Sequence, residues 1–305
     1  MSGTQAYLPK RVWISIIGLC LLPSVLNLFN ISFGTPHEQV QVYQKGTEPP
    51  EIQIEGEVPN GPSSTVIVDS RGVHLTNEEA ETLFCRLVAG EFVNSFLEWT
   101  AFCIALCTVT FAFTHYMIKG DVTTPIIGTA LFCSGMLDAF RSLAGARLLG
   151  DVTDVGKFIP FTWALSRLFN VIILAIGTGL LVWTGKRNQD WQRRSGINFI
   201  LVVGMLIILL TYVMVWLCTL LPELPNTIRQ NYLIRRPLDA IALILYLFTG
   251  GIILPRFQKI YPSVFAHSLI ISIIPNVAAQ MHAAFGSTQL FDNHFNISNY
   301  QKILA

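Results

Sequence analysis

The chain has 305 residues, of which 52% are hydrophobic and only 13% are charged, whereas soluble globular domains have about 25% charged residues. Its net charge of +1 offers no basic surface for nucleic acid, and the charged residues form short islands between long apolar runs. These features predict a polytopic membrane protein and argue against binding to nucleic acid.

Seven apolar windows are long enough to cross about 30 Å of hydrocarbon as helices. They lie at residues 12–33, 92–117, 123–148, 158–184, 197–221, 236–254 and 263–284, and an eighth helix begins at NYQKILA, where the sequence stops. The first window is too long for a signal peptide and lacks a small-residue cleavage site. We therefore predict an all-α, polytopic transmembrane helical bundle with seven complete spans plus the start of an eighth.

The distribution of Lys and Arg predicts the orientation of the bundle. With a cytoplasmic N-terminus, nine basic residues of the short connections face the cytoplasm and five face the outer side. The segment 34–91 then lies outside. In it, TVIVDSRGVHL predicts a strand, a turn and a strand, and Thr76 with Glu79 predicts the capping box of a short helix. We expect a small periplasmic α/β loop insertion between an N-terminal unit, residues 1–33, and the membrane bundle, residues 92–305.

Ionisable residues occur inside several spans, at similar depths from the outer side. Asp138 and Arg141 share one helical face at i and i+3, and Arg167 on the next span is within reach of Asp138 or Glu98. An unpaired charge in hydrocarbon costs at least about 2.5 kcal/mol, so such groups normally face the bundle interior and pair. The sequence therefore predicts one buried polar network in the outer half of the bundle.

This network has two interpretations. It either holds the helices together through interhelical polar contacts, or it binds a ligand or switches between states, because an ionisable group inside a membrane is a functional-site candidate. We take the second interpretation as the hypothesis and predict no catalytic residue. The candidate residues of the ligand-binding or switch network are Glu98, Asp138, Arg141, Trp163, Arg167, Asn170, Asp239, Gln280, His282, Asp292, His294 and Asn296.

The histidines form two pairs by depth. His115 and His267 lie near the cytoplasmic ends of their spans, and His282 and His294 lie near the outer side. Either pair has ligands that metals or haem accept, but neither has the i, i+3 or i, i+4 spacing of a helical metal site. We therefore predict no metal site, and the sequence identifies no cofactor.

A further arginine precedes the sixth span. In RRPLD, Arg236 stands before a proline that suits the first turn of a helix. An arginine in this position is expected to extend its charged group into the outer interface. Asp239, three residues later, is its candidate partner.

Four stretches, GTALFCSGMLDAFRSLAG, FIPFTWALSRLFN, RRPLDAIALILY and MHAAFGSTQLFDNHFNISNYQKILA, together resemble the multi-span membrane-associated sensor (MASE-type) domains of bacteria, over roughly residues 92–305. In that family these domains precede cytoplasmic histidine-kinase, PAS or diguanylate-cyclase modules. Arg141 and Asn299 stand where relatives often have histidine. The polar signature of the family falls on Asp138, Trp163, Arg167, Asn170, Asp239, Asn296 and Lys302.

The resemblance implies a sensory input module of a bacterial signal-transduction protein in the inner membrane. It would bind an unknown ligand or stimulus and relay it to a cytoplasmic kinase or cyclase output domain, which is absent, so the chain looks truncated in its last helix and is not expected to be an enzyme. The expected partners are the lipid bilayer, that output domain and a second copy in a homodimer. The alternative is a small-solute transporter or channel, although the sequence shows no internal repeat.

Overall fold

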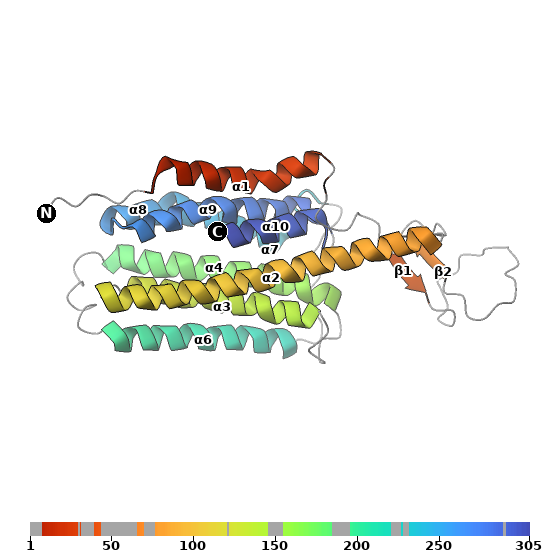
Figure 1. Ribbon diagram of the computed structural model, residues 1–305. Helices are drawn as coiled ribbons and strands as arrows, with labels where there is room; N and C mark the ends of the chain where they lie inside the picture. Colours follow the sequence, from red (N-terminus) through yellow and green to blue (C-terminus); the bar gives the residue numbers. More distant parts are fainter. Residues whose placement is uncertain are drawn as a thin grey trace, which may run out of the picture.

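The fold is a bundle of long helices that lie side by side (Figure 1). The computed structural model describes residues 8–29, 31, 40–43, 66–69, 77–120, 122–145, 155–184, 196–220, 227, 232–288 and 291–305. Within these residues, seven helical segments are long and apolar enough to cross a membrane. The predicted helical, multi-pass architecture is therefore confirmed, and each of the seven apolar windows corresponds to one of these segments.

The helices alternate in direction along the bundle. One end, where α1 ends and where α7 and α10 begin, is called the loop end, and α2 extends beyond it (Figure 1). Two spans contain a turn of π-helix: α7, η2 and α8 form one span, and α9 continues into η3. The bounds are α1 Lys10–Leu28, α2 Asn77–Lys119, α3 Thr123–Gly145, α4 Val155–Thr184, α6 Gly196–Leu220, α7 Pro237–Phe248, η2 Thr249–Ile253, α8 Leu254–Ile260, α9 Val264–Met281, η3 His282–Gly286 and α10 Asn293–Leu304.

The segment between α1 and α2 differs from its prediction. Strands β1, Val40–Tyr43, and β2, Val66–Asp69, pair in antiparallel fashion, so the partner of β2 precedes it, and the expected second strand lies outside the described residues. The predicted short helix is instead the beginning of α2, which runs for 43 residues. No proline interrupts the sequence between Asn77 and Phe92, so the helix continues into the membrane span. The described residues thus do not form a separate α/β unit.

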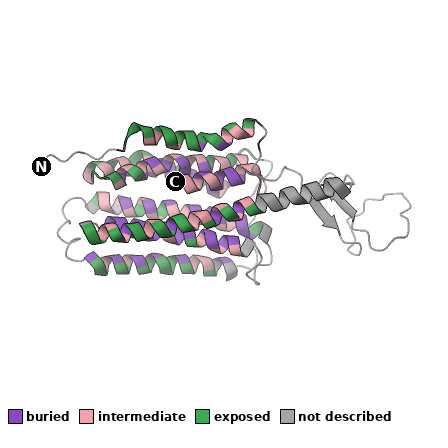
Figure 2. Ribbon diagram, viewed as in Figure 1, coloured by how far each residue is buried: buried purple, intermediate pink, exposed green. Residues whose placement is uncertain are grey.

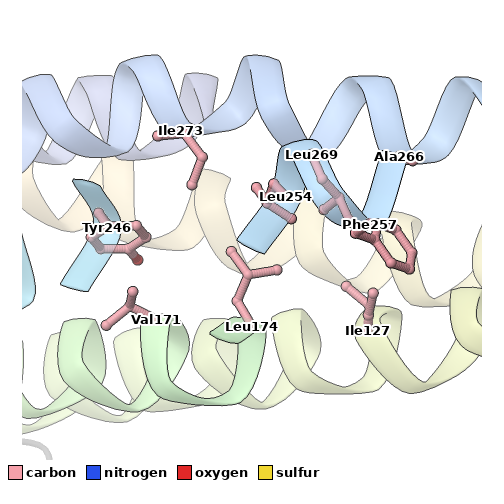
Figure 3. Packing of buried hydrophobic residues seen from close by; sticks show 9 residues of the cluster. All are labelled: Ile127, Val171, Leu174, Tyr246, Leu254, Phe257, Ala266, Leu269 and Ile273. Atoms are coloured by element: carbon pink, nitrogen blue, oxygen red, sulfur yellow. The ribbon is translucent and has the colours of Figure 1, made fainter. Parts of the chain in front are cut away.

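Burial is greatest along the middle of the bundle. Of the seven spans, α3 is the most buried and α1 the least, and buried residues gather on the inner faces of the helices (Figure 2). Away from the loop end, buried residues of α9 pack against α7 and α8, and residues of α4 join the same cluster (Figure 3). The members of this apolar cluster are Ile127, Val171, Leu174, Tyr246, Leu254, Phe257, Ala266, Leu269 and Ile273.

Helices α2 and α3 approach each other closely at two glycines of α3. A Cβ atom added to Gly128 would lie 2.6 Å from the Cβ of Ala112, and one added to Gly135 would lie 2.7 Å from the Cβ of Ala105. Seven residues separate the two positions on each helix, so the same face is involved twice. Small residues of this kind permit close packing of membrane helices, and here they bring α3 against α2.

Replacing Gly135 by Ala is expected to destabilise the bundle. The added methyl group forces α2 and α3 apart, and overpacking of this kind costs about 1 to 3 kcal/mol. A matched substitution, Gly177→Ala on α4, meets no atom within 4 Å and should leave stability unchanged or slightly raised. Thermal unfolding in detergent measures both, and equal unfolding temperatures for the two variants would contradict the close contact of α2 and α3.

Candidate functional site

Four helices bring five charged side chains together in an ion-pair cluster: Glu98 on α2, Asp138 and Arg141 on α3, Arg167 on α4 and Lys302 on α10. Arg141 donates to Oε1 of Glu98 from Nε at 2.9 Å and from Nη2 at 2.5 Å. Its Nη1 lies 3.3 Å from Oδ1 of Asp138. Oδ2 of Asp138 lies 3.8 Å from Nη2 of Arg167 and also pairs with the ammonium group of Lys302.

This geometry confirms that Glu98, Asp138, Arg141 and Arg167 form one buried network. Their side chains are each at most 2% exposed, so they face the interior of the bundle and not lipid. Asp138 is the shared member because its carboxylate contacts cations from α3, α4 and α10. Loss of one member of a buried ion pair leaves its partner without a counter-charge and is strongly destabilising. The cluster therefore restrains the relative positions of these helices.

Amide and hydroxyl groups extend the cluster. Asn94, one helical turn before Glu98, donates to Oε1 of Glu98 at 3.2 Å, and Asn299 of α10 donates to the side-chain oxygen of Asn94. Ser166 donates to Oδ1 of Asp138 at 3.4 Å. Sequence reasoning did not identify Asn94 or Ser166 as site residues. A polar side chain four residues before Glu98, on the same helical face, was the available signal for Asn94.

The ring of Trp163 lies among the three cations of the cluster. Its centroid is 4.7 Å from the guanidinium carbon of Arg141, 4.9 Å from that of Arg167 and 5.3 Å from the ammonium nitrogen of Lys302. A desolvated cation is attracted to an indole face, by about 2 kcal/mol in favourable cases. Trp163 is fully buried and also packs against Phe295 of α10 at 5.2 Å between ring centroids. Trp163 therefore belongs to the site as an apolar group that cations surround.

Arg236 lies on the other side of this aromatic pair. Its guanidinium carbon is 5.1 Å from the ring centroid of Phe295, and the residue is only 1% exposed, so the predicted extension into the interface is wrong. The backbone explains the inward position, because the amides of Arg235 and Arg236 both donate to the carbonyl oxygen of Ala284 in η3. The charge of Asp239, also 1% exposed, acts on that of Arg236.

Helix α10 is polar, yet six of its twelve residues are buried and none is exposed. Asp292 caps its first turn by accepting a hydrogen bond from the amide of Phe295 at 2.7 Å. Farther along, Ser298 donates to the carbonyl oxygen of Ala279 at 2.8 Å, and Gln301 donates to that of Cys20 at 3.1 Å. These contacts place α10 against α9 and α1, in addition to its contact with the ion-pair cluster.

The connection that leads into α10 contains a strained residue beside the cluster. Phe291 has a φ of 58°, a left-handed conformation that bulky side chains rarely adopt. Its side chain helps to line a cavity of about 10 Å³ whose other lining residues include Glu98 and Arg141, a volume that accommodates about one water molecule. The entry to α10 thus lies beside the same ion-pair cluster that Lys302 joins in the last turn.

The structure divides the predicted network into parts. Asp292 and Asn296 are buried in the first turns of α10, Gln280 is fully buried near the end of α9, and Asn170 is half-buried on α4. His282 and His294 contact each other at the loop end and belong to none of the ion pairs described above. Lys302 entered the sequence analysis only through the resemblance, and the structure places it at the centre of the cluster.

The comparisons with known proteins identify no relative of this chain. No protein-family model matches the chain, and neither a curated protein nor a solved structure matches it. The resemblance to bacterial membrane sensor domains therefore stays a prediction. What the site can do must therefore be inferred from the contacts within the ion-pair cluster and those that α10 makes with it.

Neutralising Asp138 is expected to destabilise the protein more than neutralising Glu98. Asp138→Asn removes the counter-charge from three cations, whereas Glu98→Gln removes it mainly from Arg141. Breaking a buried ion pair costs about 3 to 5 kcal/mol, and the loss for Asp138→Asn should reach this range. Unfolding of both variants in lipid nanodiscs measures the order, and a smaller loss for Asp138→Asn would contradict the central position of its carboxylate.

Proposed function

We propose that the chain is the membrane sensory input module of a bacterial signal-transduction protein, in which a stimulus acts on the ion-pair cluster and changes the docking of α10. The observation that carries this proposal is the ion pair between Lys302 of α10 and Asp138 of α3. The same carboxylate is close to Arg141 and Arg167. Any change in the charge or position of Asp138 therefore reaches the last turn of α10 directly.

Competition among cations gives the cluster the character of a switch. Three cations, from Arg141, Arg167 and Lys302, share two carboxylates, so a change that strengthens the contact of one cation with Asp138 weakens that of another. A ligand shifts such an equilibrium only through its different affinities for the two arrangements. A polar or charged ligand that contacts Arg141 or Arg167 has this property, because it alters how strongly Lys302 is held.

The course of α10 suits a relay along the bundle. The helix begins at the loop end, where Phe291 contacts the cavity beside Glu98 and Arg141, and it runs along α2 and α9 toward the opposite end. Its C-terminus lies about midway along the bundle (Figure 1). Movement of α10 is therefore a direct way to carry a change at the cluster toward a C-terminal output domain in the cytoplasm.

The proposal includes a topology. We place the loop end on the periplasmic side of the bacterial inner membrane, because the Lys and Arg residues of the short connections are more numerous at the opposite end. The extension of α2 and the ladder of β1 and β2 would then form a small periplasmic part of the protein. The ion-pair cluster would lie in the outer half of the membrane, where it is accessible to stimuli from the periplasm.

Two cavities formed by described residues lie at or near the cluster. The cavity beside Glu98 and a second one, lined in part by Thr162 and Ser166, each have a volume of about 10 Å³. Such a volume accommodates about one water molecule, and a sensor that operates by a change in helix packing needs no larger cavity. The alternative, a small-solute transporter or channel, commonly has inverted repeats, and the sequence shows no internal repeat.

Removing the charge of Lys302 is expected to alter signalling. In a chimera with a diguanylate-cyclase domain fused after Ala305, Lys302→Met should change basal output by about fivefold or more, the range of typical allosteric coupling. Lys259→Met is the matched control, because Lys259 is exposed near the end of α8. Output is measured per molecule of membrane-inserted protein, so that altered expression does not count. Equal specific output from Lys302→Met and the unmutated chimera would overturn the proposal.

Accessibility in intact cells tests the topology. In a background without native cysteines, a cysteine in place of Leu233, which is 87% exposed in the loop-end segment before α7 and lies outside the spans, should react with a membrane-impermeant maleimide. A cysteine at position 188, between α4 and α6, should react only after the cells are opened. The reverse pattern of labelling would place the loop end in the cytoplasm.

A further inference from the structure

His282 of η3 and His294 of α10 form a direct side-chain contact at the loop end. Their Nδ1 atoms are 3.0 Å apart, and their rings stack with a centroid distance of 5.3 Å. At this distance one Nδ1 donates a hydrogen bond and the other accepts it, so at least one of the two atoms carries no proton. The contact is therefore compatible with neutral rings or with one cationic ring, but not with two.

The pair lies where three elements meet. Nε2 of His282 is 3.1 Å from the hydroxyl oxygen of Ser24 on α1. One turn farther along α1, Asn27 accepts a hydrogen bond of 2.5 Å from the side-chain amide of Asn293, the first residue of α10. The rings of His282 and His294 thus link α1, η3 and the beginning of α10. Because α1 is the least buried span, its attachment relies on polar contacts such as these, together with those of Trp13 and of the carbonyl group of Cys20.

The backbone of η3 allows the ring of His294 to come close to it. A Cβ atom on Gly286 would lie 2.6 Å from both Cγ and Nδ1 of His294, so only glycine allows this ring to approach η3 so closely. The widened turn of η3 also departs from the regular helix of α9 at His282 itself, and such π turns occur frequently at functional sites. The close approach therefore depends on both the sequence and the local backbone.

Charged groups near the pair come from the segment before α7, from α7 and from the residue that precedes α10. From the segment before α7, Arg235 donates to the carbonyl oxygen of Gly286 at 2.9 Å, and the charge of Arg236 lies over Phe295. Asp239 of α7 is buried close to Arg236. The carboxylate of Asp292 accepts hydrogen bonds from backbone amides at both of its oxygens.

In the part of the chain that the structure describes, α1 and α9 supply no charged side chain at this end. On α1 the basic residues Lys10 and Arg11 lie at the opposite end of the bundle, and on α9 the nearest polar side chain is the uncharged Gln280. Among the described residues, no group of three or more His, Cys, Asp or Glu side chains is placed to hold a metal ion. Two imidazole rings in direct contact offer a binding site for a proton.

We propose that His282 and His294 form a proton-binding site that acts as an acid-opened latch between α1, η3 and the beginning of α10. At neutral and alkaline pH the Nδ1 atoms share one proton and the latch is closed. In acid, both Nδ1 atoms become protonated. Two cationic rings then face each other, the hydrogen bond is lost and the rings separate. The latch concerns the docking of α1 and does not depend on the signalling function proposed for the ion-pair cluster.

Distance measurements between spin labels test the latch in the full chain. In a variant without native cysteines, labels replace Leu28 on α1 and Leu233 before α7, which are 82% and 87% exposed. The segment of Leu233 is held to η3 by the backbone, so the label pair reports the separation of α1 from η3. In nanodiscs we expect one distance distribution at pH 8 and an additional, longer population at pH 4.5.

Two single variants assign the response to the histidine pair. In His282→Gln or His294→Gln, the glutamine offers both a donor and an acceptor, so the contact tolerates protonation of the remaining ring. At least one of these variants should show the short distance at both pH values. His267→Gln is the matched control, because His267 accepts a hydrogen bond of 3.1 Å from Trp13 at the opposite end of α1, and this variant should keep the acid response.

Two results would overturn the proposal. The first is an unchanged distance distribution at pH 4.5 in the unmutated chain, since the latch would then stay closed in acid. The second is an acid response that persists in both His282→Gln and His294→Gln, since the titrating group would then lie elsewhere. Neither measurement uses an output domain, so the outcome is separate from that of the chimera experiment.

Discussion

The carboxylate of Asp138 is the interaction on which the rest of the bundle depends. It is fully buried and lies close to cations from α3, α4 and α10. Electrostatic interactions are strong where little water is present, and an isolated charge in hydrocarbon is costly. These helices must therefore keep their charged residues at one depth and in one register. The close approach of α2 and α3 at Gly135 serves the same end, because it brings Glu98 to Arg141.

Aromatic side chains organise the polar core as much as the ion pairs do. Trp163 stands among three cations, and Phe295 stands between Trp163 and Arg236. An alternation of cations and rings therefore extends from the ion-pair cluster toward the start of α7. Rings of this size fill space that water would otherwise occupy, and their faces still attract cations.

Helix α10 is the element in which these features meet. Its first turn is attached to α1 through Asn293 and to η3 through His294, and its last turn is attached to α3 through Lys302. Between them, Ser298 and Asn299 bind α9 and α2. Such a polar helix has little affinity for lipid, so side-chain contacts hold it in place. Changes at either end of α10 are therefore well placed to alter its docking.

The sequence by itself determined the seven spans and the burial of Asp138 with Arg141 and Arg167, because hydropathy, helix length and the cost of an unpaired charge are local properties of the chain. Contacts across the bundle needed the tertiary structure. It placed Lys302 on Asp138 and turned Arg236 inward, where the sequence predicted an interfacial side chain. It also placed His282 in contact with His294, outside the ion-pair cluster. These outcomes depend on how closely the helices approach and on which residues face each other. The distance between two helices is set by the packing of side chains from both, so the sequence of one helix does not determine it.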